Sequence, residues 1–170
     1  MPKTAWVDAD KNHRPLFASF TCTIPRPRTA HGRTLAHPKP WEYEVQAYIR
    51  QLKPPVQRDV TLLGLIDGAL GSVAQFVYQT HPEMPVALIR VAAVSVEYRG
   101  QGGQLADATM EALLSRVATD LDAHGRSQAL VVARVNLSNT PSQALMTRHG
   151  FMPDGERTDA LQEWTMLIDW

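Results

Sequence analysis

The sequence predicts a mixed α/β (α+β) domain, in which a mixed sheet carries helices on its faces. Strand patterns and helical patterns alternate along the 170 residues, and three consecutive strand patterns form a meander. Asp67-Gly68 separates the first two of these strands and is a strong hairpin signal. A glycine-rich turn at 99–104 then joins the third strand directly to a helical pattern. We therefore expect a single domain over residues 1–170, built on a central sheet.

Each element follows from its local pattern. An apolar run at Leu16–Thr23 predicts the first strand, which the prolines at 25 and 27 end. A loop rich in Pro, Arg and His is expected at 25–40, and helical spacing predicts a helix at Trp41–Leu52 that stops before Pro54-Pro55. The later elements are expected as strands at Thr61–Ile66, Ala69–Tyr78 and Pro85–Val96, a helix at Gln104–His124 ended by Gly125, a strand at Ala129–Val135, a helix from about Pro141 to His149 capped by Asn139 or Thr140, and a strand at Glu163–Ile168.

Composition narrows the class of protein. The chain is 44% apolar and 20% charged, and no apolar run approaches the roughly 20 residues of a membrane span. Charged residues from Lys3 to Lys11 interrupt any signal-peptide core. Cys22 is the only cysteine, so no internal disulfide forms and a cytoplasmic location is expected. The six histidines show no ligand spacing, and no metal is expected.

The charge is unevenly distributed, although the net charge is zero. Residues 1–60 hold ten Lys and Arg against five Asp and Glu, a net of +5, and residues 61–170 hold seven against twelve, a net of −5. Eight of the twelve prolines fall in the first 55 residues. The basic, proline-rich segment 1–40 could contact nucleic acid, or it could be a solvated lead-in. No aromatic residues alternate with its basic ones in the way typical of nucleic-acid binding.

The glycine-rich turn predicts an anion site. A strand that ends in glycines and opens a helix brings free backbone N–H groups to the positive end of a helix dipole, where a phosphate binds well. Arg99 adds a cation. A nucleotide-hydrolase loop is excluded, because it ends in Gly-Lys-Ser/Thr and no lysine follows Lys53. A dinucleotide fingerprint is excluded too, because the sixth position counted from Gly100 is Leu105.

From about residue 60 to residue 170 the sequence resembles the GNAT superfamily of N-acetyltransferases. The family signature Gln/Arg-x-x-Gly-x-Gly/Ala is matched by Arg99-Gly-Gln-Gly-Gly-Gln104, with Val96-Glu-Tyr98 before it. A second family segment, with Asn-x-x-Ala/Ser spacing and a closing Gly-Phe, is matched by residues 139–151. The resemblance implies the GNAT fold, with a mixed, mostly antiparallel sheet of six to seven strands flanked by helices. It also implies acetyl-CoA as the acyl donor.

The resemblance also implies where acetyl-CoA binds. Backbone amides of Gln101 to Leu105 would hold the pyrophosphate, and residues 92–94 would pair with the pantetheine arm like an added strand. The amide near Val94 would face the thioester carbonyl and stabilise a developing oxyanion. The expected cofactor-binding residues are Ala92, Val94, Arg99, Gly100, Gln101, Gly102, Gly103, Gln104, Leu105 and Asn139, the last bonding the pantetheine from the opposite side.

Three positions depart from the family pattern. Gln104 replaces the final small residue of the signature, and its side chain is expected to point away from the phosphates or simply to start the helix. Met146 stands where many members have the tyrosine that protonates the leaving thiolate, and Arg134 where some have a glutamate base. Tyr78, Tyr98 and Glu97 are the remaining candidates for proton transfer. Tyr78 could equally be a core aromatic and Glu97 a solvated loop residue.

The leading functional hypothesis is an acetyl-CoA-dependent N-acyltransferase, in which a primary amine attacks the thioester directly in a ternary complex. The alternative is a GNAT-fold module that binds acyl-CoA for sensing or interaction, with weak or no catalysis. The acceptor could be a small-molecule or peptide amine, and a homodimer is expected by analogy. The acceptor would be selected by residues 25–60 and 79–85, which carry no specific motif. Membrane attachment is not expected, and acetylation of a charged tRNA or a nucleic-acid-associated protein stays open.

Overall fold

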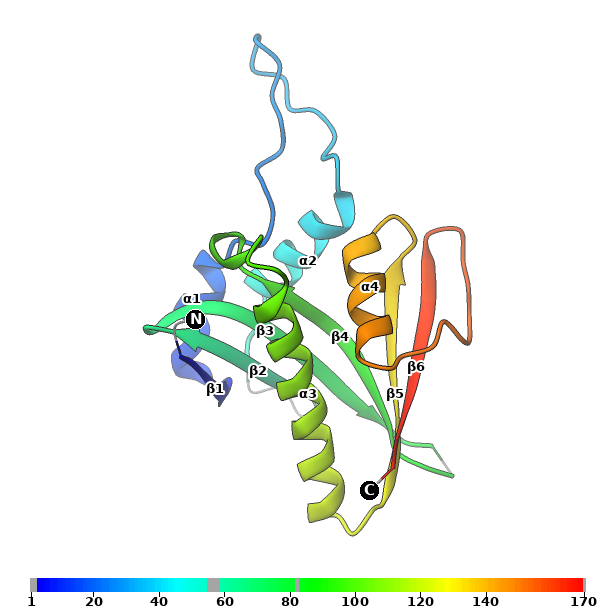
Figure 1. Ribbon diagram of the computed structural model, residues 1–170. Coiled ribbons are helices and arrows are strands. Elements are labelled where there is room, and N and C mark those ends of the chain that lie inside the picture. The colour runs from blue at the N-terminus through cyan, green and yellow to red at the C-terminus, as the bar shows by residue number, and fades with distance from the viewer. Residues whose placement is uncertain (1–2, 55–58, 82, 170) are drawn as a thin grey trace.

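The structure, a computed structural model, describes residues 3–54, 59–81 and 83–169 of the chain. Within these residues six strands form one sheet in the order β1-β2-β3-β4-β5-β6 (Figure 1). The strands are β1 (Thr4–Asp8), β2 (Asp59–Ile66), β3 (Ala69–Gln79), β4 (Val86–Val94), β5 (Gln128–Asn136) and β6 (Leu161–Asp169). All neighbours pair antiparallel except β4 and β5, which are parallel. The expected mixed, mostly antiparallel sheet is confirmed.

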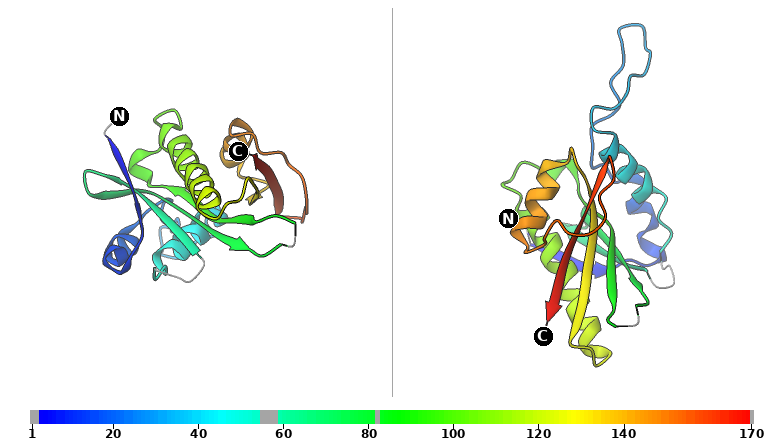
Figure 2. Two further views of the ribbon diagram at one scale, coloured as in Figure 1. Left: turned by 90° about the horizontal axis from the view of Figure 1, so that it is seen from below. Right: turned by 90° about the vertical axis from the view of Figure 1, so that its right-hand side faces the viewer.

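Helices cover both faces of this sheet. Figure 2 shows α1 (Arg14–Ser19) and α2 (Pro40–Arg50) on one face and α3 (Gln104–Ala123) on the other, the face that α4 (Thr140–Arg148) also covers. Each face has its own buried apolar cluster, centred on Phe17 on the α1 side and on Phe76 on the α3 side. No helix in the described part of the chain is both long enough and apolar enough to cross a membrane.

Local signals predicted most of these elements correctly. Asp67 and Gly68 both have positive φ, +51° and +82°, as the tight turn between β2 and β3 requires. The predicted helices and the last five strands agree with the structure to within a few residues. The third meander strand ends at Val94 rather than Val96, because residues 96–98 turn into a short 3₁₀ helix, η2 (Val96–Tyr98). The helix predicted to stop before Pro54-Pro55 ends at Arg50, while residues 55–58 and residue 82 lie outside the described residues.

The prediction of a first strand at Leu16–Thr23 is wrong. Residues 11–19 form the 3₁₀ helix η1 (Lys11–His13) and then α1, because Asp10 caps this segment and Pro15 sits in the first helical turn. Phe17 and Phe20, three positions apart, are buried on one side. The first strand is instead β1, whose Trp6 lies opposite Gly64 of β2 and covers the space where a side chain is missing.

The segment between α1 and α2 is a long loop, as expected. It extends away from the rest of the molecule, and its two arms meet at an isolated bridge between Arg28 and Thr34 (Figures 1 and 2). At its base the guanidinium of Arg26 stacks 4.2 Å from the ring centre of Tyr43 on α2. Its return arm leads directly into α2, which lines the pockets described below.

Candidate functional site

The site begins where the two parallel strands separate. Pairing between β4 and β5 covers only Val86–Ile89 and Leu130–Ala133, although both strands continue, to Val94 and Asn136. A bulge causes the departure: on β3, Gln75 pairs with Val91 and the next residue pairs with Ile89, which leaves Arg90 without a partner. Figure 1 shows β4 and β5 close together near the C-terminus and diverging towards α2 and α4. Beyond Ile89, β4 therefore has an edge that no other described strand covers.

The glycine-rich turn lies next to this edge. Gly100, Gly102 and Gly103 have φ of +79°, +67° and +79°, a conformation that favours glycine, and a Cβ at Gly100 or Gly102 would meet nothing within 4 Å. The backbone N–H groups of residues 100–106 make no well-formed hydrogen bond to another described residue. These donors, at the start of the 20-residue helix α3, form a site suited to a pyrophosphate.

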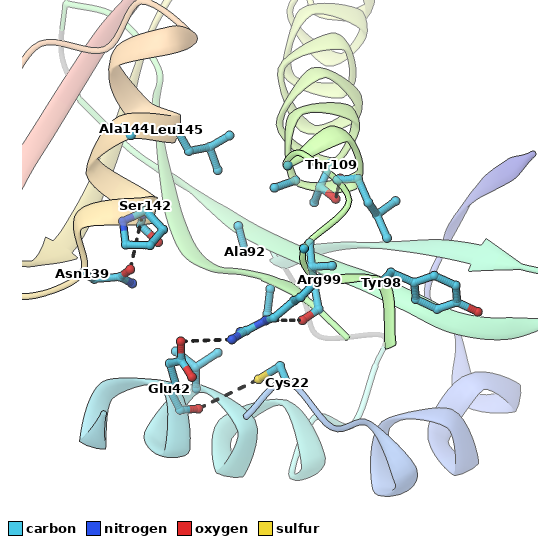
Figure 3. A pocket seen from close by; sticks show the side chains of 18 of the residues that line it. Cys22, Glu42, Ala92, Tyr98, Arg99, Thr109, Asn139, Ser142, Ala144 and Leu145 are labelled. Carbon is cyan, nitrogen blue, oxygen red and sulfur yellow. Dashed lines mark hydrogen bonds and ion pairs between the residues drawn. The ribbon is translucent and has the colours of Figure 1, made fainter. Parts of the chain in front are cut away.

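A pocket of about 550 Å³ joins the turn to the edge of β4 (Figure 3). Its lining comes from α2, β4, the turn, α3 and α4. Eight of the ten predicted cofactor-binding residues line it, namely Ala92, Val94, Arg99, Gly100, Gly102, Gly103, Leu105 and Asn139. Gln101 and Gln104 do not line it, and both are exposed. Asn139 caps α4 by accepting a hydrogen bond from Ser142 N at 3.3 Å, and so stands at the far wall of the pocket.

Two arginines line the pocket near the glycine turn, and sequence analysis identified only one of them. Arg99 follows η2, whereas Arg148 is the last residue of α4. The Arg148 guanidinium lies beside Gly103, since a Cβ built there would be 3.5 Å from its Nη2, and it pairs with Asp107 at 2.8 Å. A basic residue near the end of a helix is common, so the sequence alone does not mark Arg148 as a pocket residue. The packing of α4 against the start of α3 places it there.

Glu42 on α2 was also missed, and it is the partner of Arg99. The Arg99 guanidinium bonds Glu42 Oε1 at 3.0 Å and the Val94 carbonyl at 3.3 Å, so its side chain lies across the pocket (Figure 3). Lys39 adds a second ion pair to Glu42 at 3.4 Å, and the Thr23 hydroxyl donates to its other oxygen at 2.9 Å. Burial acts to raise the pKa of Glu42, but Arg99, Thr23 and Lys39 outweigh it and hold that pKa below its ordinary value.

We expect Glu42→Gln to lower the free energy of unfolding at pH 7 by about 1 kcal/mol, because it removes two ion pairs from a partly buried site. A carboxyl whose pKa is depressed by folding stabilises the protein above its unfolded pKa, about 4.3, and the stabilisation is lost as the pH falls through the folded value. The difference from the wild type should therefore begin to shrink below about pH 4.3 in urea titrations and vanish once the pH is below the folded pKa of Glu42. Glu44→Gln, on the same helix and without an ion pair among the described residues, is the control. A pH-independent difference for Glu42→Gln would contradict this account.

The three residues predicted for proton transfer are not brought together. Tyr78 lies outside the pockets, and its hydroxyl donates to Asp120 at 3.2 Å; burial and that carboxylate raise its pKa. Glu97 is exposed on η2 and lines no pocket. Tyr98 does line the large pocket, but Figure 3 shows its hydroxyl directed away from Ala92 and Asn139. Met146, at the family's tyrosine position, is buried beside the opening that the separated ends of β4 and β5 leave between them.

The lone cysteine also lines the pocket. Cys22 is fully buried, and its thiol donates weakly to the Glu42 carbonyl at 3.9 Å. Burial raises the pKa of Cys22 to about 11, with Arg99 and Glu42 acting in opposite directions. The thiol is therefore protonated at neutral pH. Among the described residues no group of three or more His, Cys, Asp or Glu side chains could hold a metal ion.

The six-stranded mixed sheet with helices on both faces matches the GNAT fold. Similar solved structures include an acetyltransferase from Thermus thermophilus, at 16% identity and a TM-score of 0.62, covering 99% of this chain and 100% of that chain. The GNAT domain of S. lividans PAT is similar at 13% identity and a TM-score of 0.63, covering 97% of this chain and 90% of that chain. The NatC complex bound to Gag peptide and CoA is similar at 12% identity and a TM-score of 0.58, covering 99% of this chain and 99% of that chain. No protein-family model matches the chain, and no curated protein matches it either.

Proposed function

We propose that the protein is an acetyl-CoA-dependent N-acetyltransferase that acetylates a small-molecule or peptide amine. One observation carries the proposal: the unbonded N–H groups of residues 100–106 adjoin an uncovered edge of β4, within one pocket of the described structure. A phosphate group needs the first, and an amide-containing arm needs the second. The fold shared with acetyltransferases, one of them solved with CoA, supports the same assignment.

Each part of the pocket has a role in this proposal. Amides of residues 101–105 would hold the pyrophosphate, and Arg99 and Arg148 would supply positive charge beside it. Residues 92–94 would pair with the pantetheine arm, with Asn139 bonding it from the other side. Arg99 would supply this charge from a guanidinium that is also paired with Glu42.

Acetyl-CoA supplies a thioester whose carbonyl carbon bonds to the amine nitrogen as the C–S bond breaks, with CoA leaving as thiol and one proton released from the ammonium. The chain's contribution would be to position the two reactants on opposite sides of the opening. A backbone amide near Val94 would stabilise the charge that develops on the carbonyl oxygen. Neither Met146 nor Arg134 can move the protons, and water in the open cleft would carry them.

Direct transfer in a ternary complex is favoured over a covalent acetyl-enzyme. Cys22 is the only cysteine in the chain, and with a pKa of about 11 it is a poor nucleophile at neutral pH. Its burial among apolar residues of the α1 face also limits its access to a thioester.

The experiment that tests the proposal uses the whole protein with acetyl-CoA, first alone and then with a panel of amines. We expect calorimetry to show acetyl-CoA binding, intact-mass spectrometry to show no acetylated protein without amine, and thiol release to begin only when an amine is present. Failure to bind acetyl-CoA would overturn the proposal. An acetylated Cys22 that passes its acetyl group to an amine would overturn the ternary mechanism alone.

A second function is favoured by the two departures beside the opening. Met146 and Arg134 line the smaller pocket in place of a tyrosine and a glutamate. An acyl-CoA-binding module for sensing or interaction would need neither proton-transfer group. Tight binding of acetyl-CoA with no thiol release on any amine would identify this alternative.

A further inference from the structure

Two smaller pockets lie at the opening between the separated ends of β4 and β5, and α2 contributes to the lining of both. They measure about 320 Å³ and 230 Å³. Ala92 and Asn139 line both the large pocket and the first of the small ones, so the two spaces meet at the opening. An amine that entered from the α2 side would reach the edge of β4 from the face opposite the glycine turn.

Two arginines flank this entrance. The pairing of β4 with β5 ends at Ile89 and Ala133, so Arg90 and Arg134 are the next residues on the two strands. Ile89 and Ala133 belong to the apolar cluster on the α3 side, and the alternation of side chains directs their neighbours to the α2 side. Both arginines line both small pockets, together with Tyr48 of α2. The bulge matters here, because it lets Arg90 and Ala92 face opposite sides of the sheet.

The two arginines differ in their partners. Arg134 pairs with Glu163 across the β5–β6 ladder at 3.2 Å and with Glu156 at 3.8 Å, while half of its side chain stays exposed. Arg90 has no ion pair with any described residue. Both guanidinium groups line the same two pockets, so an anion bound there can accept hydrogen bonds from both.

The lining also holds one carboxylate. Glu44 extends into the first small pocket from α2, opposite the strands that carry the arginines. A pocket with cationic groups at the strands and an anionic group on the facing helix matches a ligand that carries both charges. It does not match a polyamine, which carries positive charges only.

We propose that this entrance selects an acceptor amine that also carries an anionic group, a carboxylate or a phosphate, which Arg90 and Arg134 bind. The inference rests on the proposed function and names the substrate class of that site. The planar guanidinium group can bind either a carboxylate or a phosphate, so the experiment below decides which of the two anions the acceptor carries. Arg134, which replaces a base in the family pattern, is then a specificity residue.

The test compares matched amines with the wild-type protein and saturating acetyl-CoA. The probes are the common α-amino acids against their α-amides, phosphoethanolamine against ethanolamine, and spermidine. We expect the anionic member of at least one pair to have a kcat/KM at least tenfold higher than its neutral partner, and spermidine to be among the poorest acceptors. A preference for the amino acid or for the phosphate identifies which anion is bound.

The variants Arg90→Gln and Arg134→Gln should each reduce that preference about tenfold, mainly through KM, with the rate on the neutral partner within about twofold of the wild type. Arg126→Gln, an exposed arginine in the turn after α3, is the matched control and should change nothing. Equal acetylation of both members of every pair, or a preference that survives both variants, would overturn the inference and leave the proposed function standing. A wild-type protein that does not bind acetyl-CoA would overturn both the inference and the proposed function.

Discussion

Gly102→Glu is expected to abolish acetyl-CoA binding, with a loss of affinity of at least about a hundredfold. Gly102 has φ of +67°, and a side chain there would enter open space beside the free N–H groups of the turn. A glutamate would place a bulky anion where the pyrophosphate is proposed to bind, so repulsion adds to blockage. Isothermal calorimetry with acetyl-CoA measures the effect.

Two controls separate this effect from backbone strain. A non-glycine residue in the left-handed region costs about 1–2 kcal/mol wherever it occurs. Gly125→Glu, at the other end of α3, has φ of +61° and equally open space, so it should lose similar stability and no affinity. Gly102→Ala should lose less than tenfold in affinity. Wild-type affinity in a folded Gly102→Glu protein would rule out the glycine turn as the phosphate site.

Ala92→Trp is expected to lower kcat/KM by at least about a hundredfold, which corresponds to about 2.7 kcal/mol in the transition state. Ala92 is the exposed β4 residue that lines both the large pocket and the first small one. An indole at this position would fill the opening through which the amine must meet the thioester. Steady-state thiol release gives the measurement, and urea unfolding should show a change below about 1 kcal/mol, since no buried contact is lost.

The matched control is Ala69→Trp, an exposed alanine at the start of β3 and away from the pockets. It adds the same bulk to the same sheet and should retain wild-type kcat/KM. A folded Ala92→Trp protein with unchanged kcat/KM would mean that the acceptor does not pass through the opening.

The prediction of the fold was accurate where neighbouring residues decide the backbone. Asp67-Gly68 forms its turn with the two positive φ angles that the motif requires, and Asn139 caps α4 as its position suggested. The prediction was wrong for Leu16–Thr23, where an apolar run suits either a short strand or a helix. The helix is the conformation that buries Phe17 in the apolar cluster on the α1 face of the sheet.

The candidate site, too, was predicted only where it depends on residues close together in the sequence. The glycines of the turn and the edge of β4 were found, because a strand, a turn and a helix in succession form one local unit. Glu42 was missed because it lies 57 residues from Arg99. The one trace of the β4 bulge in the sequence is an arginine within the apolar run Val86–Val94, and that pattern also suits an exposed strand residue.

The sequence by itself determined the glycine turn, the proposed phosphate-binding end of the site, since positive φ angles and the free amides of a helix start depend on residues a few positions apart. The tertiary structure alone decided the acceptor end. Arg90 and Arg134 come together because Ile89 and Ala133 pair in register and the two strands part directly after them, and the bulge then turns Ala92 to the opposite side of the sheet. Contacts across a sheet depend on register and curvature, which the chain acquires only when its strands pair.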